Sequence, residues 1–359
     1  MEIKNLLLAF TATALAFLFN LYIIPGLIHL SHKKNWYDDA HDERKIHTGL
    51  ISRLGGIGIL ASLVIASVIT SLVTSKLLHS SVLFRLSPHH NPLLILLGVI
   101  LIFIIGLLDD FTDMKARKKL LGQVLAALLV ILGGAGIRFF TIPFWGITLN
   151  LSWFGPLLTL FWLVGMTNAI NLIDGLDGLS AGISSIACFI YGIAFLISGD
   201  IMLSIISFTL LGSLMGYLFY NFPPAKIFMG DSGSLSLGFI LALLPLLGSP
   251  ESGDSLVMPV VMLFIPIADV LAAMLRRRRK GMHFFSPDKE HMHHKLLDLK
   301  LDARQILSII IGLQIVAGFA VLLFLLVKGP LRYVSILIAL LLVVTLFLYL
   351  HWDRHYKKS

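Results

Sequence analysis

Asn168-Ala-Ile-Asn171-Leu-Ile-Asp174-Gly-Leu-Asp177-Gly178 joins two apolar runs, residues 151–164 and 179–197. Its amides and acids recur every three residues, so they share one face of a helix, Asp177 included if the turn at Gly175 stays helical. In a membrane helix such a row is costly unless it lines water, a metal or a substrate. A plain polar loop between two helices is the alternative. We expect a functional site here, with the rest of the chain arranged around it.

The composition is that of a polytopic membrane protein. Of the 359 residues, 57% are hydrophobic and 13% are charged, whereas a soluble domain carries about 25% charged residues. Apolar runs of about 18–22 residues recur along the chain, and each can cross a hydrocarbon core about 30 Å thick. We predict an all-α polytopic integral membrane protein in which residues 1–359 form a single transmembrane domain of about eleven helices.

The predicted spans lie near residues 5–30, 54–76, 92–108, 120–141, 149–167, 179–198, 201–220, 233–248, 256–275, 305–327 and 331–350. The run Gly133-Gly134-Ala135-Gly136 weakens the fourth span, and a re-entrant segment there would invert every later one. With the amino terminus outside, 22 of the 28 Lys and Arg residues fall in inside loops, as the positive-inside rule requires. The polar stretches then all face the cytosol.

The net charge of +8 has a membrane explanation. The basic residues lie beside the spans and are not interleaved with aromatics, so anionic headgroups or a phosphorylated substrate explain them better than nucleic acid. We therefore expect membrane lipid as a partner and no nucleic acid. Cys188, the only cysteine, lies in an apolar run, so no intrachain disulfide can form.

An acidic pair, Asp109-Asp110, ends the third predicted span, and Asp113 and a basic group up to Lys119 follow it. Adjacent carboxylates repel, so one pKa tends to rise unless a cation lies between them. This arrangement suits Mg²⁺ binding or proton abstraction from a phosphate. The alternative is helix capping, which accounts for one aspartate rather than for three.

Two further polar stretches precede spans. Residues 221–234 carry two prolines that stop a helix, and then Asp231 between two glycines, which resembles a phosphate or metal cradle without the spacing of a P-loop. Residues 42–49, with His47, run into Gly55-Gly56. Here the glycines let backbone approach an anionic group or a neighbouring helix, and a positively charged anchor loop explains the stretch equally well.

The last polar stretch combines a basic run, Arg276–Lys280, with His291, His293 and His294. Three histidines in four residues suggest zinc. The acids elsewhere offer oxygen ligands, which favours Mg²⁺ instead, and leaves the histidines in a cationic loop suited to a diphosphate.

Taken in this order, the stretches resemble the motifs of the polyprenyl-phosphate N-acetylhexosamine-1-phosphate transferases, in particular the bacterial undecaprenyl-phosphate GlcNAc-1-phosphate transferase branch. The similarity covers about residues 38–304. Its most specific pieces are Asp109-Asp110 with Lys119, residues 168–178, residues 225–234 and His291-x-His293-His294. Departures are Lys289 after Asp288 where relatives often have arginine, Lys300 for a usual glycine, and Ser52 for a common proline.

The resemblance implies roles for individual residues. Asp109 and Asp110 match the acidic pair that activates the lipid phosphate, Asp231 the principal Mg²⁺ ligand, and Phe228 the aromatic that stacks on uracil. The implied catalytic residues are Asp109, Asp110, Lys119, His291, His293 and His294; the substrate-binding residues are Asn168, Asn171, Asp174, Asp177, Phe228, Arg276 and His47; and the metal ligands are Asp231 and Asn171. The implied cofactor is Mg²⁺, with Mn²⁺ as a substitute.

The implied reaction is phosphoryl transfer at a cytosolic-face active site in the bacterial inner membrane. An oxygen of undecaprenyl phosphate attacks the β-phosphorus of a UDP-sugar and UMP leaves. The acid pair acts as a base, or one member first forms a covalent phospho-enzyme; both mechanisms stay open. A homodimer is compatible with this interpretation.

The donor is predicted from the last loop. Its split histidines after Asp288-Lys289 resemble the hexosamine branch and favour UDP-GlcNAc, whereas the phospho-MurNAc-pentapeptide transferases carry three consecutive histidines. A transporter of lipid-linked substrates is the alternative of a different class. Transporters place ionisable residues near the bilayer midplane, whereas these acids lie at span ends, with Asp269 as the main exception.

Overall fold

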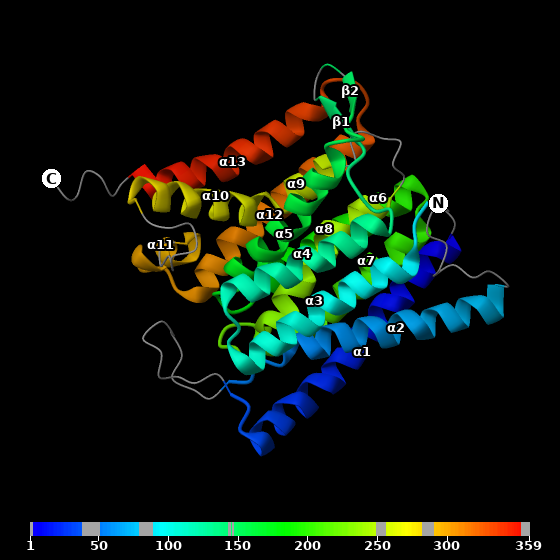
Figure 1. The fold of residues 1–359 in the computed structure, drawn as a ribbon, viewed down its shortest axis with the longest axis vertical. Coiled ribbons are helices and arrows are strands. Elements are labelled where there is room, and N and C mark those ends of the chain that lie inside the picture. Colours follow the sequence, from blue (N-terminus) through cyan, green and yellow to red (C-terminus); the bar gives the residue numbers. More distant parts are fainter. Residues whose placement is uncertain are drawn as a thin grey trace.

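A computed structural model describes residues 3–37, 51–78, 89–142, 145, 147–248, 256–281 and 291–352. Its helices are α1 (Ile3–Lys34), α2 (Gly55–Leu78), α3 (Pro92–Thr112), α4 (Ala116–Leu132), α5 (Gly155–Ile173), α6 (Leu179–Ser198), α7 (Ile201–Asn221), α8 (Gly230–Leu247), α9 (Val257–Met262), α10 (Phe264–Arg279), α11 (Met292–Asp298), α12 (Ala303–Leu326) and α13 (Arg332–Trp352). Among the described residues, the only strands are β1 (Phe139–Ile142) and β2 (Ile147–Asn150), which form one antiparallel hairpin. The predicted all-α membrane fold is confirmed (Figure 1).

Two of the eleven predicted spans, the fourth and the ninth, differ from the helices of the structure. In the described ranges, nine helices are long and apolar enough to cross a membrane. The fourth predicted span, residues 120–141, is wrong at its end, because α4 stops at Leu132 after 17 residues and residues 139–142 form β1. The glycine run causes this end: Gly134 adopts a φ of +87°, which is incompatible with a continuing helix.

The ninth predicted span, residues 256–275, is two helices, α9 and α10, that are interrupted at Leu263. The break follows from Pro266, which has no N–H to donate to the carbonyl of Met262. Gln314 of α12 supplies a donor in its place, because its Nε2 bonds that carbonyl at 2.8 Å. The packing of α12 therefore stabilises the interruption.

The polar ends of several helices meet at one end of the bundle. α3 and α5 end there, and α4 and α8 begin there, since hydrogen bonds join Asp109, Lys119, Asn171 and Asp231. Because α3 and α5 end on the same side, the segment between them must lead the chain to the other side. The hairpin lies at that opposite end (Figure 1). The fourth segment is therefore not re-entrant.

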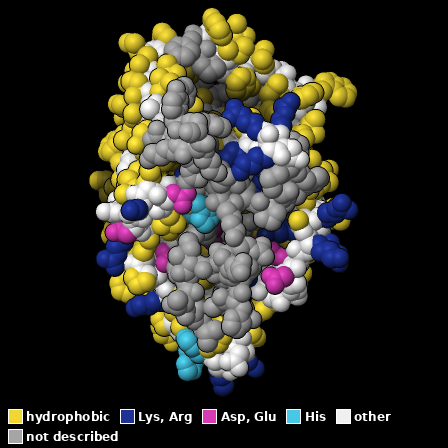
Figure 2. Space-filling view, turned by 90° about the vertical axis from the view of Figure 1, so that its left-hand side faces the viewer, with side chains coloured by type: hydrophobic (Ala, Val, Ile, Leu, Met, Phe, Trp, Pro, Cys, Tyr) yellow, Lys and Arg dark blue, Asp and Glu magenta, His cyan; other side chains and the backbone are white. Residues whose placement is uncertain are grey.

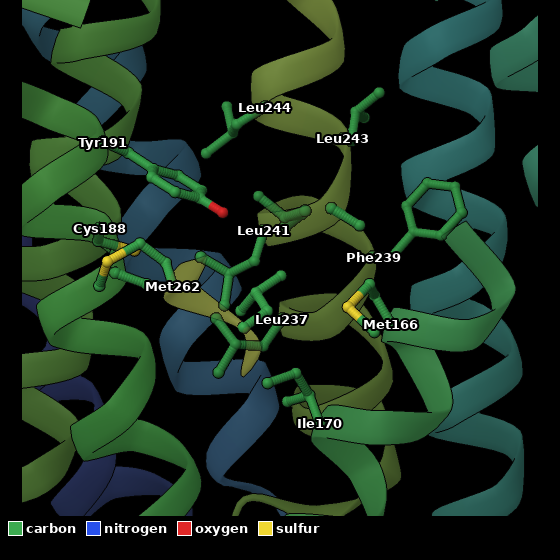
Figure 3. Close-up of a cluster of buried hydrophobic side chains, with 14 of the residues drawn as sticks. Met166, Ile170, Cys188, Tyr191, Leu237, Phe239, Leu241, Leu243, Leu244 and Met262 are labelled. Atoms are coloured by element: carbon green, nitrogen blue, oxygen red, sulfur yellow. The ribbon is translucent and has the colours of Figure 1, made fainter. Parts of the chain in front are cut away.

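Helix α8 lies at the centre of the bundle, and its residues from Ser232 to Leu247 are all buried. Its side chains pack against Met166 and Ile170 of α5, Tyr191 of α6 and Met262 of α9 (Figure 3). A helix enclosed in this way cannot shift without disturbing most of the core, because interiors are close-packed. The residues at its first turn are therefore held firmly.

Helices α1, α2 and α7 are joined by buried polar contacts. The side-chain amide of Asn20, which is 0% exposed, donates to the carbonyl of Ser213 at 2.6 Å. Ser213 Oγ lies 2.5 Å from Ser62 Oγ and donates to the carbonyl of Ile59 at 2.6 Å. Small residues let these helices approach closely, as is typical of helix packing in membranes.

A second, smaller hydrophobic cluster holds α11 against α10, α12 and α13. Its buried members are Ile173, Leu176, Leu179, Ile183, Ile265, Met292, Leu296, Ile306, Leu307, Ile310, Val343, Phe347 and Leu350. Since Ile173 and Leu176 belong to the central stretch, this cluster brings the histidine-bearing helix to it.

Candidate active site

The start of α8 is capped by a carboxylate from another helix. Asp110, near the end of α3, accepts the backbone N–H of Asp231 at 2.6 Å through Oδ1 and that of Ser232 at 2.9 Å through Oδ2. Gly230 permits this approach with a φ of +70°, and a Cβ there would lie 2.7 Å from Asp110 Oδ1. Because the first N–H groups of a helix lack partners within it, a carboxylate in this place stabilises the helix.

The segment before α8 pairs with the segment before α2. Phe228 donates its N–H to the carbonyl of Ser52 at 2.8 Å, and its own carbonyl accepts the N–H of Gly55 at 3.0 Å. Gly56 donates to the carbonyl of Met229 at 2.8 Å. The Phe228 side chain, predicted to stack on uracil, is partly exposed beside this paired segment. Ser52 supplies its backbone carbonyl to this pairing.

Four helices contribute to one hydrogen-bonded chain around Asp231. Lys119 of α4 donates to Asp109 Oδ2 at 2.9 Å and also to Asp231 Oδ2. The amide nitrogen of Asn171, in α5, bonds Asp231 Oδ1 at 2.9 Å and Ser234 Oγ at 2.8 Å. The structure therefore brings together Asp109, Lys119, Asn171 and Asp231, all of which were predicted to belong to the site.

The central stretch leaves the helix at Asp174. This residue is the C-cap of α5, and burial raises the pKa of its carboxyl well above the ordinary value, with further contributions from Asp231 and Asp110. Asp177 lies beyond the helix, in the turn before α6, so the shared helical face does not extend to it. Its Oδ2 accepts the N–H of Ala225 at 2.9 Å. Asp177 therefore ties this turn to the loop before α8.

Asn168 lies one helical turn further into the bundle than Asn171. Its side-chain nitrogen donates to Gln123 Oε1 of α4 at 2.7 Å, and its oxygen accepts from Gln123 Nε2 at 3.2 Å. Gln123 is 1% exposed. This pair of side-chain amides joins α4 to α5 one helical turn away from the hydrogen-bonded chain around Asp231.

The histidines meet the central stretch at Gly175. A Cβ on Gly175 would lie 2.9 Å from Nε2 of His293, so only glycine allows the imidazole to approach this closely. His293 is 2% exposed, and burial, with a smaller contribution from neighbouring His294, lowers its pKa to about 4. Its ring centroid lies 6.0 Å from that of His291 and 4.3 Å from that of His294.

His291 is held by a residue outside the predicted set. Its Nδ1 lies 2.8 Å from Asp269 Oδ2, and the N–H of Met292 donates to Asp269 Oδ1 at 2.8 Å. Arg276, also on α10, is 9% exposed near the end of that helix. Side chains of Lys, Arg, Asp and His all reach the surface at this end of the molecule (Figure 2). The prediction for His47 lies outside the described residues, as does the segment with Asp288 and Lys289.

Comparisons with known proteins identify the family of the chain. Residues 92–249 match the family model for glycosyl transferase family 4. A probable undecaprenyl-phosphate N-acetylglucosaminyl 1-phosphate transferase of Bacillus subtilis (strain 168) is 37% identical over 76% of this chain and 73% of its own length. The undecaprenyl-phosphate alpha-N-acetylglucosaminyl 1-phosphate transferase of Yersinia pestis is 32% identical over 81% of this chain and 76% of its own length.

The chain belongs to the polyprenyl-phosphate N-acetylhexosamine-1-phosphate transferases. The transferase is also 29% identical, over 80% of its length and 90% of the other chain, to a phospho-N-acetylmuramoyl-pentapeptide-transferase of Staphylococcus aureus (strain JH9). The resemblance inferred from the sequence is thus confirmed, and the transferase is a glycosyl-1-phosphate transferase.

The family generally depends on a divalent metal, and the donor atoms of this transferase fit a hard cation. Among the described residues, no group of three or more His, Cys, Asp or Glu is arranged to hold a metal ion. Asp109 and Asp231 nevertheless share one positive charge, the Lys119 ammonium. Mg²⁺ needs few protein carboxylates and takes its remaining ligands from water and phosphate. The described His291, His293 and His294 form no metal-holding group either, so these histidines offer no preformed zinc set.

Sequence reasoning missed three contributors to this site. Asp269 was noticed only as an acid within a predicted span, and Gln123 carried no signal apart from its polarity. Asn221, the last residue of α7, accepts the N–H of Gly178 at 2.8 Å and donates to the carbonyl of Ile227 at 2.8 Å. Its place directly before Phe222-Pro223-Pro224 was the available signal, because a polar residue at that point can tie the loop to its neighbours.

Proposed function

We propose that this transferase moves GlcNAc-1-phosphate from UDP-GlcNAc to undecaprenyl phosphate and releases UMP, at the cytosolic face of a bacterial inner membrane. The observation that carries the proposal is the chain of Asp109, Lys119, Asp231 and Asn171 at one end of the bundle. It places an ammonium between two carboxylates at the end of several membrane spans. A lipid phosphate and a soluble nucleotide sugar can both reach that level.

The two acids of the pair take different roles in this proposal. Both oxygens of Asp110 are occupied by backbone N–H groups of α8, so its carboxylate positions Asp231. Asp109 accepts the N–H of Met114 at 2.6 Å through Oδ1 and turns Oδ2 to Lys119. Asp109 is therefore the member that can act on the lipid phosphate, as a base or as a nucleophile, when Lys119 moves to the phosphate.

Mg²⁺, or Mn²⁺ in its place, would be held by Asp231 with Asn171 beside it, and would neutralise charge on the diphosphate. Lys119 contributes a second positive charge in the same place. The side-chain nitrogen of Asn171 donates to Oδ1 of Asp231 and so fixes that carboxylate. Asp174 lies close enough to Asp231 for their charges to interact. The protein thus supplies a preorganised electrostatic environment for two phosphates that approach each other.

The donor assignment is supported by the relatives whose names specify N-acetylglucosamine, which reach 37% identity against 29% for the pentapeptide transferase. Of the loop on which the prediction from sequence relied, Asp288 and Lys289 lie outside the described residues, whereas the split histidines lie within them.

The experiment is a donor competition with the purified transferase in detergent. UMP release is followed with undecaprenyl phosphate and either UDP-GlcNAc or UDP-MurNAc-pentapeptide, with Mg²⁺ added or chelated. We expect turnover with UDP-GlcNAc that requires Mg²⁺. Turnover of the pentapeptide donor alone would assign the transferase to the other branch. Uptake of a lipid-linked substrate into vesicles without UMP release would favour the transporter.

A further inference from the structure

Asp269 is a buried acid that the proposed reaction does not use. It lies in α10, is 2% exposed, and has partners for both of its oxygens. One partner is the backbone N–H of Met292, the first residue of α11. The other is the imidazole of His291, which precedes that helix. A single carboxylate therefore fixes both the start of α11 and the ring before it.

The place of Asp269 depends on the interruption between α9 and α10. Pro266 lies three residues before Asp269, and Gln314 bonds the carbonyl that Pro266 leaves without a donor. α10 is thus a separate helix, and its first turns pack in the same hydrophobic cluster as Met292 of α11. The acid is presented to the histidine by a helix whose start is fixed on α12.

The contact determines which nitrogen of His291 carries a proton. A carboxylate only accepts hydrogen bonds, so Nδ1 is the donor and carries the proton, and Nε2 is the nitrogen left on the other edge of the ring. The hydrogen bond found for the His291 ring within the described residues is the one made by Nδ1. The ring stands parallel to His293, at an interplanar angle of 6°, and His293 in turn lies against Gly175.

We propose that Asp269 is a positioning residue of the transferase: it holds His291 with its proton on Nδ1 and so presents Nε2 to the sugar-phosphate part of the donor. The proposal rests on the proposed function for the identity of the donor. It gives Asp269 a role in the site that goes beyond packing of α11.

The variant Asp269→Asn separates the two functions of the carboxylate. The amide oxygen can still accept the N–H of Met292, so α11 keeps its backbone contact. The amide nitrogen can only donate, and it therefore favours a His291 ring with its proton on Nε2. In metal sites, loss of the group that orients a histidine ligand costs about 10- to 100-fold in metal affinity or activity. We expect a loss in this range in kcat/KM for UDP-GlcNAc, with an unchanged melting temperature.

The test is a double-mutant cycle of Asp269→Asn and His291→Gln, assayed for kcat and KM. If Asp269 acts through His291, the double variant has the activity of His291→Gln alone. If Asp269→Asn lowers activity by the same factor in both backgrounds, Asp269 acts through packing and the proposal is overturned. The matched control is Asp302→Asn, the same exchange at the start of α12, where the acid accepts the N–H of Gln305 at 2.8 Å and contacts no histidine.

A second measurement does not depend on turnover. In ¹⁵N-histidine-labelled protein, the resonances lost in His291→Gln identify the ring, and they should show a proton on Nδ1 in the native chain and on Nε2 in Asp269→Asn. An unchanged tautomer in Asp269→Asn overturns the inference whatever the activity. If UDP-GlcNAc is no substrate but the tautomer changes as expected, the donor assignment fails and the Asp269–His291 contact stands.

Discussion

The site has an acidic half, formed by Asp109, Asp110, Lys119, Asn171 and Asp231, and a histidine half, formed by His291, His293 and His294. Both halves contain the same kind of contact, but the surrounding structure differs. In each, an aspartate from one helix bonds the first residues of another: Asp110 at the start of α8, and Asp269 at the start of α11. α8 is an 18-residue helix enclosed by the core, whereas α11 has seven residues and packs in the smaller cluster. The positions of the acids are thus fixed by the whole fold, whereas the positions of the histidines depend on a few local contacts.

The difference indicates which parts of the site can adapt. Asp231 is fixed by its backbone, by Asn171 and by Lys119. The histidines touch the acidic half through the close approach of His293 to Gly175. We therefore expect substitutions in the acidic half to abolish chemistry or destabilise the core, and substitutions in the histidine half to change donor affinity by smaller factors.

The largest expected effect is that of Asp231→Asn. The amide keeps the shape of the side chain but loses the charge that faces Lys119, so kcat should fall by about 10³-fold, as when a group that stabilises the transition state is removed. Thermal unfolding and Mg²⁺ dependence of turnover are measured together. Near-normal turnover with native Mg²⁺ dependence would remove Asp231 from the site.

The second prediction separates the members of the acid pair. Asp110→Asn turns an amide N–H toward a backbone donor of α8, which should destabilise the fold by about 1–3 kcal/mol. Asp109→Asn should lower kcat without raising KM and leave stability unchanged, because its contribution belongs to the transition state. Thermal melts and steady-state kinetics of both variants decide the matter. If Asp110→Asn is as stable as the native protein and has the lower kcat of the two variants, the roles of Asp109 and Asp110 are the reverse of those proposed.

A smaller effect is expected at the junction of the halves. Gly175→Ala places a Cβ 2.9 Å from His293 Nε2 and forces the ring to shift. Overpacking of this kind costs about 1–3 kcal/mol, and we expect most of it as a rise of about 3- to 10-fold in KM for the donor. Gly165→Ala is the matched control, because a Cβ at that position of α5 meets nothing within 4 Å. If Gly175→Ala and Gly165→Ala have equal KM values for the donor, the contact of His293 with Gly175 does not influence donor binding.

The last prediction concerns stability rather than activity, and it is a pH dependence. The pKa of His293 is lowered to about 4 from an ordinary value of 6.5. Between these values the unfolded chain binds a proton that the folded chain does not, so stability falls as pH decreases from about 6.5 to about 4 and is fully present above that range. Melting temperatures across this window measure the effect. His293→Gln should flatten the dependence, and an unchanged slope in that variant would assign it to other groups.

The motifs predicted the acidic half well because its members stand at span ends within short stretches of sequence. The division of labour between Asp109 and Asp110 could not be predicted, since it depends on α8, more than 100 residues away in the chain. Asp177 was expected on the same helical face if the turn at Gly175 stayed helical, but α5 ends at Ile173 with Asp174 as its C-cap. Likewise, the end of α4 was obscured by apolar residues of the hairpin that read as a continuing span.

The histidine half was predicted as a motif but not as a structure. The sequence placed the histidines in a cationic loop. The structure shows that Asp269, which contacts His291, lies in α10, and that Gly175, which His293 approaches, lies in the turn between α5 and α6. Asp269 was visible as an acid in an otherwise apolar segment, and a buried acid of this kind needs a partner. Its partner could not be chosen from the sequence because several cations and histidines were available nearby.

The contact between Asn20 and Ser213 has a consequence for biosynthesis. The amide in the first helix bonds a carbonyl in the seventh, 193 residues later in the chain. During membrane insertion, α1 therefore enters the bilayer long before its partner is made, and an amide in hydrocarbon is costly without one. Until the ribosome has delivered α7, this polar side chain must be accommodated by the insertion machinery, by water or by lipid headgroups. A nascent chain released before that point would carry a first helix whose side-chain amide nitrogen lacks its native acceptor, the carbonyl of Ser213.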